Sequence, residues 1–212
     1  MEFIDDLLAQ AKEQALPRHE AQAKKRDDYI PRTLIPSREK ENHDKSQTLT
    51  YPVNQQVKDH EIFDLNRKGT VILGRAGAGK SYLTSRVYHD ALKHFVEANG
   101  KAPFPIYLDC SSHVIPTSNS ICDALRTRGP MERYERIIDE HPQGLFLFLD
   151  EADTRIRKNP AFAADLKGDF QRIESEANSF RFLISSRKSE WKRIQEIQST
   201  LFQKEVEVLS FP

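Results

Sequence analysis

The sequence predicts an α/β protein in which helices cover both faces of one mostly parallel sheet. Short apolar runs alternate with amphipathic stretches from residue 69 onward, the order expected when each strand is followed by a crossover helix. Runs such as Leu145–Leu149 contain no polar residue, which is typical of strands buried on both faces. The five runs predict strands at residues 70–73, 104–108, 145–149, 180–185 and 206–209.

Length and composition limit the classes of protein that fit. The chain has 212 residues, enough for one domain plus an arm at roughly 150 residues per domain. Its 32 basic residues balance 32 acidic ones, so we do not expect direct binding to nucleic acid. The chain has only two cysteines and an acidic N-terminus, which predicts a cytoplasmic protein. It has no long apolar run, so we do not expect it to bind membranes.

The N-terminal part differs in pattern from the rest. Apolar residues from Phe3 to Ala11 recur at helical spacing, so residues 1–30 are interpreted as an α-helical arm. Its apolar stripe either packs on the core of this chain or contacts a partner protein. Residues 31–66 are polar and contain three prolines, which predicts a linker wrapped over the core domain at residues 67–212.

A phosphate-binding motif follows the first predicted strand. Residues 74–81, GRAGAGKS, match G-x-x-x-x-G-K-[ST] between a strand and a helix that contains Leu83 and Val87. The fold class is therefore a three-layer P-loop NTPase sandwich, in which Lys80 neutralises phosphate charge and the Ser81 hydroxyl binds Mg²⁺. The predicted nucleotide-binding residues are Gly74, Arg75, Ala76, Gly77, Ala78, Gly79, Lys80, Ser81 and Tyr82.

Acidic residues follow the third predicted strand directly. The run at 145–149 ends in Asp150-Glu151-Ala152-Asp153, a Walker B pattern in which Asp150 would hold Mg²⁺ together with Ser81. Glu151 and Asp153 are both candidates to activate the attacking water, and the sequence does not choose between them. Arg187 follows the fourth strand, where it can reach the γ-phosphate, so the predicted catalytic residues are Glu151, Asp153 and Arg187.

Over residues 69–210 these motifs resemble the NACHT-type branch of the STAND nucleotide-binding proteins, which are related to AAA+ ATPases. The resemblance rests on Leu73–Ser81, on the strand with Asp150 and Asp153, and on Ile184-Ser185-Ser186-Arg187. It implies a five-stranded sheet in the order 5-1-4-3-2 and bound ATP or ADP. Tyr29-Ile30-Pro31-Arg32 is similar to the family segment that encloses adenine.

The resemblance also implies a role. Family members are regulatory ATPases that hydrolyse ATP slowly and form homo-oligomers when a trigger is recognised, in prokaryotes often in antiphage defence. The N-terminal helix would be the contact for a protein trigger or effector. Relatives continue beyond the fifth strand into further domains, so this chain is expected to be a fragment of a longer protein or a stand-alone core.

Other functions fit parts of the pattern. Glu151 directly after Asp150 is the arrangement of AAA+ proteins, which favours a ring ATPase with an arginine finger at Arg155, Arg157 or Arg172. A nucleotide-binding module without significant hydrolysis is the third alternative. The letters of residues 150–153 also spell the DEAD of RNA helicases, but a chain with one phosphate loop and one set of strands lacks the two lobes that a helicase needs.

Overall fold

A computed structural model describes residues 2–15, 35–36, 69–111, 120–128, 131–187, 189–191 and 206–210. Its strands are β1 (Ile35–Pro36), β2 (Gly69–Leu73), β3 (Phe104–Asp109), β4 (Leu145–Asp150), β5 (Phe180–Ser186) and β6 (Val206–Ser210). Its helices are α1 (Glu2–Gln10), the π-helical turn η1 (Ala11–Ala15), α3 (Lys80–Glu97), α4 (Ile121–Arg128), α5 (Met131–Glu140), α6 (Ala152–Lys158) and α7 (Ala161–Glu176).

The strands form one sheet in the order β1-β6-β2-β5-β4-β3. The pairs from β6 to β3 are all parallel, whereas β1 runs antiparallel to β6. The sequence predicted five strands, and the sheet has six because Ile35–Pro36 adds a short edge strand. Two residues within a polar, proline-containing stretch give no periodic signal, so this strand was not predictable from the pattern.

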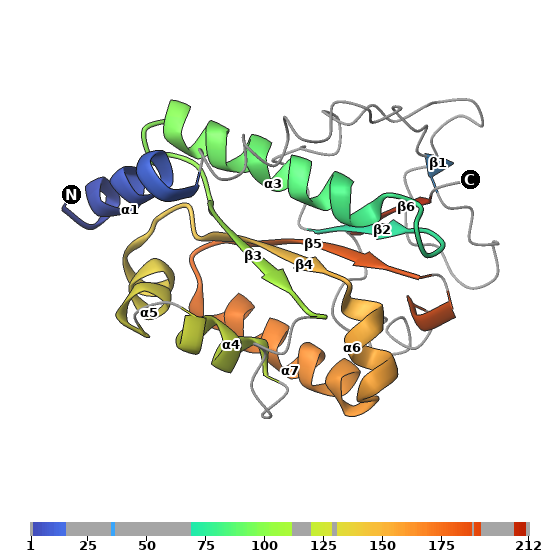
Figure 1. Cartoon of the computed structure of the whole chain (residues 1–212). Helices are drawn as coiled ribbons and strands as arrows, with labels where there is room; N and C mark the ends of the chain where they lie inside the picture. Colours follow the sequence, from blue (N-terminus) through green and yellow to red (C-terminus); the bar gives the residue numbers. More distant parts are fainter. Residues whose placement is uncertain are drawn as a thin grey trace, which may run out of the picture.

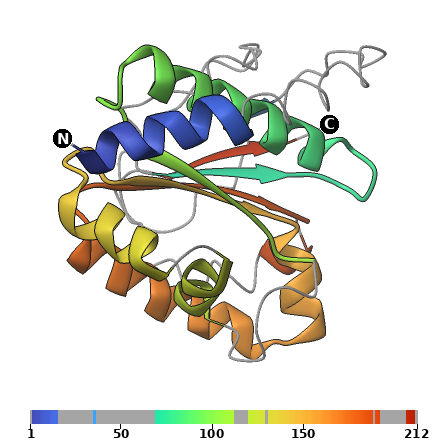
Figure 2. The ribbon, with the colours of Figure 1, turned by 60° about the vertical axis from the view of Figure 1, so that its left-hand side comes forward.

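Helices cover both faces of the sheet, so the α/β prediction is confirmed. In Figures 1 and 2, α3 and α1 lie on one side of the sheet, and α4, α5, α6 and α7 lie on the other. The central strands β2 and β4 are buried along their whole length, as the uninterrupted apolar runs predicted. Their alternate side chains separate into two layers, with Ile72 and Phe148 packed toward Leu83 and Val87 of α3.

The helix α1 is part of this packing. Phe3, Leu7 and Leu8 are buried in the main hydrophobic core, and the guanidinium of Arg136 lies 4.3 Å from the centre of the Phe3 ring. A Cβ atom at Gly100 would lie 2.4 Å from the Ile4 side chain, so the close approach requires glycine there. The apolar stripe of α1 therefore packs on this chain's own core, which was one of its two predicted fates.

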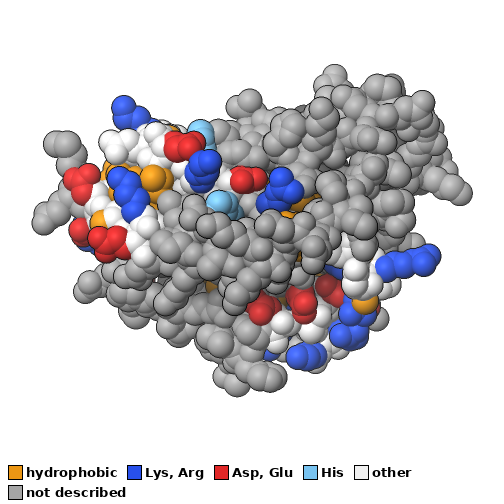
Figure 3. Space-filling view, turned by 45° about the horizontal axis from the view of Figure 1, so that its top comes forward, with side chains coloured by type: hydrophobic (Ala, Val, Ile, Leu, Met, Phe, Trp, Pro, Cys, Tyr) orange, Lys and Arg blue, Asp and Glu red, His pale blue; other side chains and the backbone are white. Residues whose placement is uncertain are grey.

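The described surface carries both signs of charge. In Figure 3, acidic and basic side chains lie beside one another on the face that includes α1 and α3. This mixture agrees with the balance of 32 basic and 32 acidic residues in the sequence. None of the helices within the described ranges has both the length and the apolar composition that crossing a bilayer requires.

Candidate nucleotide-binding site

The loop after β2 has the backbone that a phosphate cradle needs. Gly77 and Gly79 have positive φ angles of 74° and 91°, a conformation that glycine adopts without strain. The Ala78 amide donates to the Arg75 carbonyl at 3.2 Å, which closes the turn. A Cβ atom placed on Gly77 would have nothing within 4 Å, so space is open on that side of the loop. The loop start is anchored because the Gly74 amide donates to the Ser186 carbonyl at 3.2 Å.

The loop leads directly into the N-terminus of α3. The cap residue is Gly79, so no side chain accepts a hydrogen bond from the first turn of this helix of 18 residues. The first N–H groups of a helix have no partner within the helix, and the helix dipole places partial positive charge there. Loop and helix end together suit a phosphate group.

Lys80 lies over the phosphate loop. Its Nζ donates to the carbonyls of Gly74 at 3.1 Å and Arg75 at 3.0 Å. Burial lowers the pKa of Lys80, while the carboxylate of Asp153 opposes that shift and the nearby Arg187 guanidinium adds to it. The two carbonyl groups therefore hold the Lys80 ammonium at the loop. An anionic ligand could take their place as its hydrogen-bond partner.

The acids predicted from the sequence lie where β4 ends. Asp150 is 4% exposed, and its Oδ1 accepts hydrogen bonds from the Ser185 hydroxyl and from the Glu151 amide, the latter at 3.0 Å. Glu151 caps α6 with φ 53° and ψ 35°, a left-handed conformation that is costly for a residue other than glycine. Such outliers are concentrated at functional sites, where surrounding contacts hold them in place.

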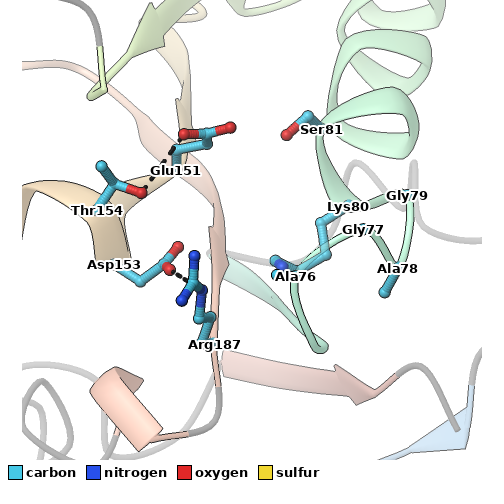
Figure 4. Close-up of a pocket in the computed structure, with 10 residues that line it drawn as sticks. All are labelled: Ala76, Gly77, Ala78, Gly79, Lys80, Ser81, Glu151, Asp153, Thr154 and Arg187. Atoms are coloured by element: carbon cyan, nitrogen blue, oxygen red, sulfur yellow. Dashed lines mark hydrogen bonds and ion pairs between the residues drawn. The ribbon is translucent and has the colours of Figure 1, made fainter.

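Asp153 and Arg187 form an ion pair. The Nε atom of Arg187 lies 2.8 Å from Oδ2 of Asp153, whose side chain is 5% exposed. Figure 4 shows the pair on the opposite side of the pocket from the phosphate loop, with Lys80 facing it. Two of the three predicted catalytic residues thus bind each other in this structure.

One pocket of about 330 Å³ joins these parts. Figure 4 shows the loop on one side and α6 on the other, with the Ser81 hydroxyl directed toward the Glu151 side of the pocket. Of the predicted residues, Gly74, Arg75, Tyr82 and Asp150 do not line it. The lining residues are Ala76, Gly77, Ala78, Gly79, Lys80, Ser81, Glu151, Asp153, Thr154 and Arg187.

Three further polar residues belong to the site and were not assigned roles from the sequence. Thr154 lines the pocket, with its hydroxyl 3.4 Å from Oε2 of Glu151. Ser185 and Tyr107 bind the Asp150 carboxylate. Thr154 directly follows the predicted acids and Ser185 lies within the predicted motif Ile184–Arg187, so the sequence held a signal for both, whereas Tyr107 is separated from Asp150 by 43 positions.

The predicted adenine segment and the candidate arginine fingers lie outside the pocket lining or outside the described residues. Tyr29–Arg32, the segment expected near adenine, is outside the described residues. Arg155 and Arg157 lie on α6, and Arg172 lies on α7 with its Nε 3.0 Å from Glu176. An arginine finger at one of these three residues stays a prediction.

The donor set fits Mg²⁺ better than a transition metal. The site offers a serine hydroxyl and carboxylate oxygens, which are hard ligands, and Mg²⁺ completes its shell with water and phosphate oxygens. Within the described ranges, no three His, Cys, Asp or Glu side chains are grouped as a protein-only metal site would require. The predicted metal ligands Ser81 and Asp150 would each supply an oxygen atom of this kind.

No protein-family model and no curated protein matches the chain. Among solved structures, the chain is similar to the ORC2 protein of Aeropyrum pernix, in an ADP form and in ADPNP-ADP complexes, with 18% sequence identity and a TM-score of 0.48 for each. Each match covers 69% of this chain and 42% of the ORC2 chain, so this chain spans less than half of that protein's length. At this similarity, no property of ORC2 is assigned to this chain.

Proposed function

We propose that this chain is a nucleotide-binding module that holds ATP or ADP with Mg²⁺ and hydrolyses ATP slowly. The observation that carries the proposal is the pocket in which the loop of residues 76–81 faces Glu151, Asp153 and Arg187. A glycine loop at a helix N-terminus binds phosphate groups, and acids opposite it suit a metal ion and a water molecule.

Binding is assigned to the loop and to Lys80. The backbone of residues 74–79 would surround the β-phosphate, and Lys80 would exchange its two carbonyl partners for β- and γ-phosphate oxygens. Ser81 and Asp150 would hold Mg²⁺, which supplies charge neutralisation to the phosphates. Adenine in preference to guanine follows from the NACHT resemblance.

The ion pair of Asp153 with Arg187 favours Glu151 as the acid that activates water. Oδ2 of Asp153 is already occupied by the guanidinium of Arg187 at 2.8 Å, so this oxygen is not free to hold the attacking water. In the proposed step, the water oxygen bonds to the γ-phosphorus, the bond to the β–γ bridging oxygen breaks, and Glu151 takes the water proton. The products are ADP and inorganic phosphate.

The Asp153–Arg187 pair favours slow turnover. It also supports a second candidate function, a module that binds nucleotide without significant hydrolysis. Arg187 stabilises the γ-phosphate in the transition state less strongly while the Asp153 carboxylate offsets part of its charge. A long-lived bound state is what a switch requires, because a partner can then shift its population.

The regulatory role is proposed from the resemblance. We assign the chain to a NACHT-like, nucleotide-dependent oligomerisation switch in signalling or antiviral defence, with AAA+-type ring assembly as the alternative. The observed order β6-β2-β5-β4-β3 supports the 5-1-4-3-2 arrangement of this class. Ile35 pairs with Ser210 of β6, and Ser210 pairs with Leu73, the residue before the glycine loop. This contact supports the proposed division into an arm at residues 1–30, a linker at 31–66 and a core at 67–212, with the linker passing close to the loop.

Nucleotide content and affinity test the proposal. Purified wild type is expected to release ADP or ATP on denaturation and to bind Mg-ATP in calorimetry. Lys80→Ala should weaken binding by at least about tenfold, because a charge-assisted contact to phosphate is lost. Lys93→Ala is the matched control, since Lys93 lies on the same helix with a side chain that is 61% exposed. A wild-type chain that binds neither nucleotide would contradict the proposal.

Oligomerisation is tested separately by native mass spectrometry. A switch is expected to change mass between the ADP-bound and ATP-bound states, with a smaller change in Lys80→Ala. A chain that binds both nucleotides and remains monomeric would retain the binding function and remove the assembly role.

A further inference from the structure

A buried hydrogen-bond network surrounds Asp150. The Tyr107 hydroxyl donates to Oδ2 of Asp150 at 2.7 Å, and Ser185 donates to Oδ1. The Glu151 amide also donates to Oδ1, at 3.0 Å. A carboxylate has about four acceptor sites, two on each oxygen. The three protein donors leave one acceptor site open, and it is on Oδ2, the atom that Tyr107 binds.

The sheet register places the two hydroxyl donors on either side of Asp150. Tyr107 of β3 pairs with Phe148 and Asp109 pairs with Asp150, so Tyr107 reaches Asp150 diagonally between neighbouring strands. On the other side, Leu149 pairs with Ile184, which puts Ser185 next to Asp150. Donors from β3 and β5 thus fix the plane of a carboxylate at the end of β4.

Packing fixes the Tyr107 ring itself. Its centre lies 5.4 Å from that of Tyr88, and Tyr107 packs against the layer between the sheet and α3. A phenol is neutral at physiological pH, so the Tyr107 hydroxyl is the donor in its hydrogen bond with Asp150.

We propose that Tyr107 is a positioning residue for the metal site: its hydroxyl orients Oδ2 of Asp150 so that the one open acceptor site is directed toward the water shell of Mg²⁺. This inference rests on the proposed nucleotide-binding function. Tyr107 does not line the pocket, so it acts through Asp150 and not on the nucleotide. Outer-shell partners of metal ligands typically change metal affinity by about 10- to 100-fold when removed.

The test is Tyr107→Phe, which removes the hydroxyl and keeps the ring. ATP affinity is measured with Mg²⁺ and with EDTA, and the ratio of the two gives the coupling between metal and nucleotide. The variant is expected to bind ATP as wild type does in EDTA and to lose roughly tenfold of the tightening caused by Mg²⁺. Electron paramagnetic resonance of Mn²⁺ with ATP should show a matching loss of bound metal.

The matched control is Tyr88→Phe, in which a buried phenol hydroxyl is removed from the ring that packs on Tyr107. It should keep the wild-type coupling, and thermal unfolding of both variants checks that the fold is retained. Equal coupling in wild type and Tyr107→Phe would overturn the inference and leave nucleotide binding intact. Equal affinity of wild type with and without Mg²⁺ would also overturn it. A wild-type chain that binds no ATP under either condition would remove the proposed function itself.

Discussion

Arg187 and Asp153 are joined by an ion pair of 2.8 Å that links the end of β5 to the first turn of α6. The Asp153 side chain is almost fully buried at 5% exposure, whereas the Arg187 side chain is 35% exposed at the pocket. A guanidinium has five N–H donors, and the pair engages Nε. Arg187 is thus placed at the pocket with N–H donors left for a ligand, but its positive charge is shared between Asp153 and any γ-phosphate bound there.

Competition predicts opposite effects from the two members of the pair. Arg187→Ala should reduce the preference for ATP over ADP by about tenfold or more, because a charge-assisted bond to the γ-phosphate is lost. Asp153→Asn should raise ATP affinity severalfold, because Arg187 is released from its carboxylate partner. Calorimetry with ATP and ADP in the presence of Mg²⁺ measures both effects.

The control for this pair is Lys158→Ala, which removes an exposed basic residue on the same helix as Asp153. It should leave the ATP to ADP ratio unchanged. If Asp153→Asn weakened ATP binding as strongly as Arg187→Ala, Asp153 would be a ligand of the nucleotide complex and not a competitor for the arginine.

Turnover should depend more on Glu151 than on Asp153. Glu151→Gln removes the proposed proton acceptor and keeps the size of the side chain, so phosphate release should fall by roughly 10²- to 10⁴-fold while ATP affinity stays near that of wild type. Multiple-turnover phosphate release measures the rate. A larger loss in Asp153→Asn than in Glu151→Gln would exchange their roles, and unchanged rates in both would remove both assignments.

The left-handed backbone of Glu151 should make this residue costly for stability. Glu151→Gly relieves a conformation that costs a non-glycine residue about 1–2 kcal/mol, and part of that gain is offset by the greater chain entropy of glycine. The free energy of unfolding in urea should therefore rise by about 0.5–1 kcal/mol while turnover is lost. Glu174→Gly on α7 is the contrasting control and should lower stability by about 1 kcal/mol. A stability loss in Glu151→Gly would show that contacts of the Glu151 side chain outweigh its backbone strain.

Local sequence signals explain why much of the fold was predictable, and why residues predicted for the site lie around one pocket. The strands β2 and β4 are buried on both faces, and this forces uninterrupted apolar runs that are visible in the sequence. The phosphate loop needs glycines at fixed spacing because Gly77 and Gly79 have positive φ. Asp150, Glu151 and Asp153 come at the end of a buried strand in the sequence. Their position at the carboxyl end of that strand could therefore be predicted from chain order alone.

Contacts between distant segments could not be predicted in the same way. Whether Tyr107 reaches Asp150 depends on the register between β3 and β4, and a shift by one residue would turn the tyrosine to the other face. The pairing of Arg187 with Asp153 depends on how α6 leaves β4, which the unusual backbone of Glu151 determines. The sequence named both charged residues but gave no sign that they bind each other.

A buried histidine far from the pocket predicts how stability responds to acid. His141 is fully buried, and its ring lies 5.8 Å from that of Phe95. Burial lowers the pKa of His141 below its usual value of 6.5, while a hydrogen bond with the Ala102 backbone acts in the opposite direction. The unfolded chain therefore binds a proton at a higher pH than the folded chain. Stability should be constant above about pH 7 and fall as the pH decreases through 6.5 toward the folded-state pKa.

The slope from one proton is at most about 1.4 kcal/mol per pH unit. Urea unfolding at several pH values measures it, and His141→Gln should flatten the part of the curve between about pH 5 and 7 even if its overall stability is lower. His94→Gln on α3 leaves His141 in place and should keep the wild-type slope. If His141→Gln kept the full slope, protonation of His141 would not be the cause, and other groups would account for the loss of stability in acid.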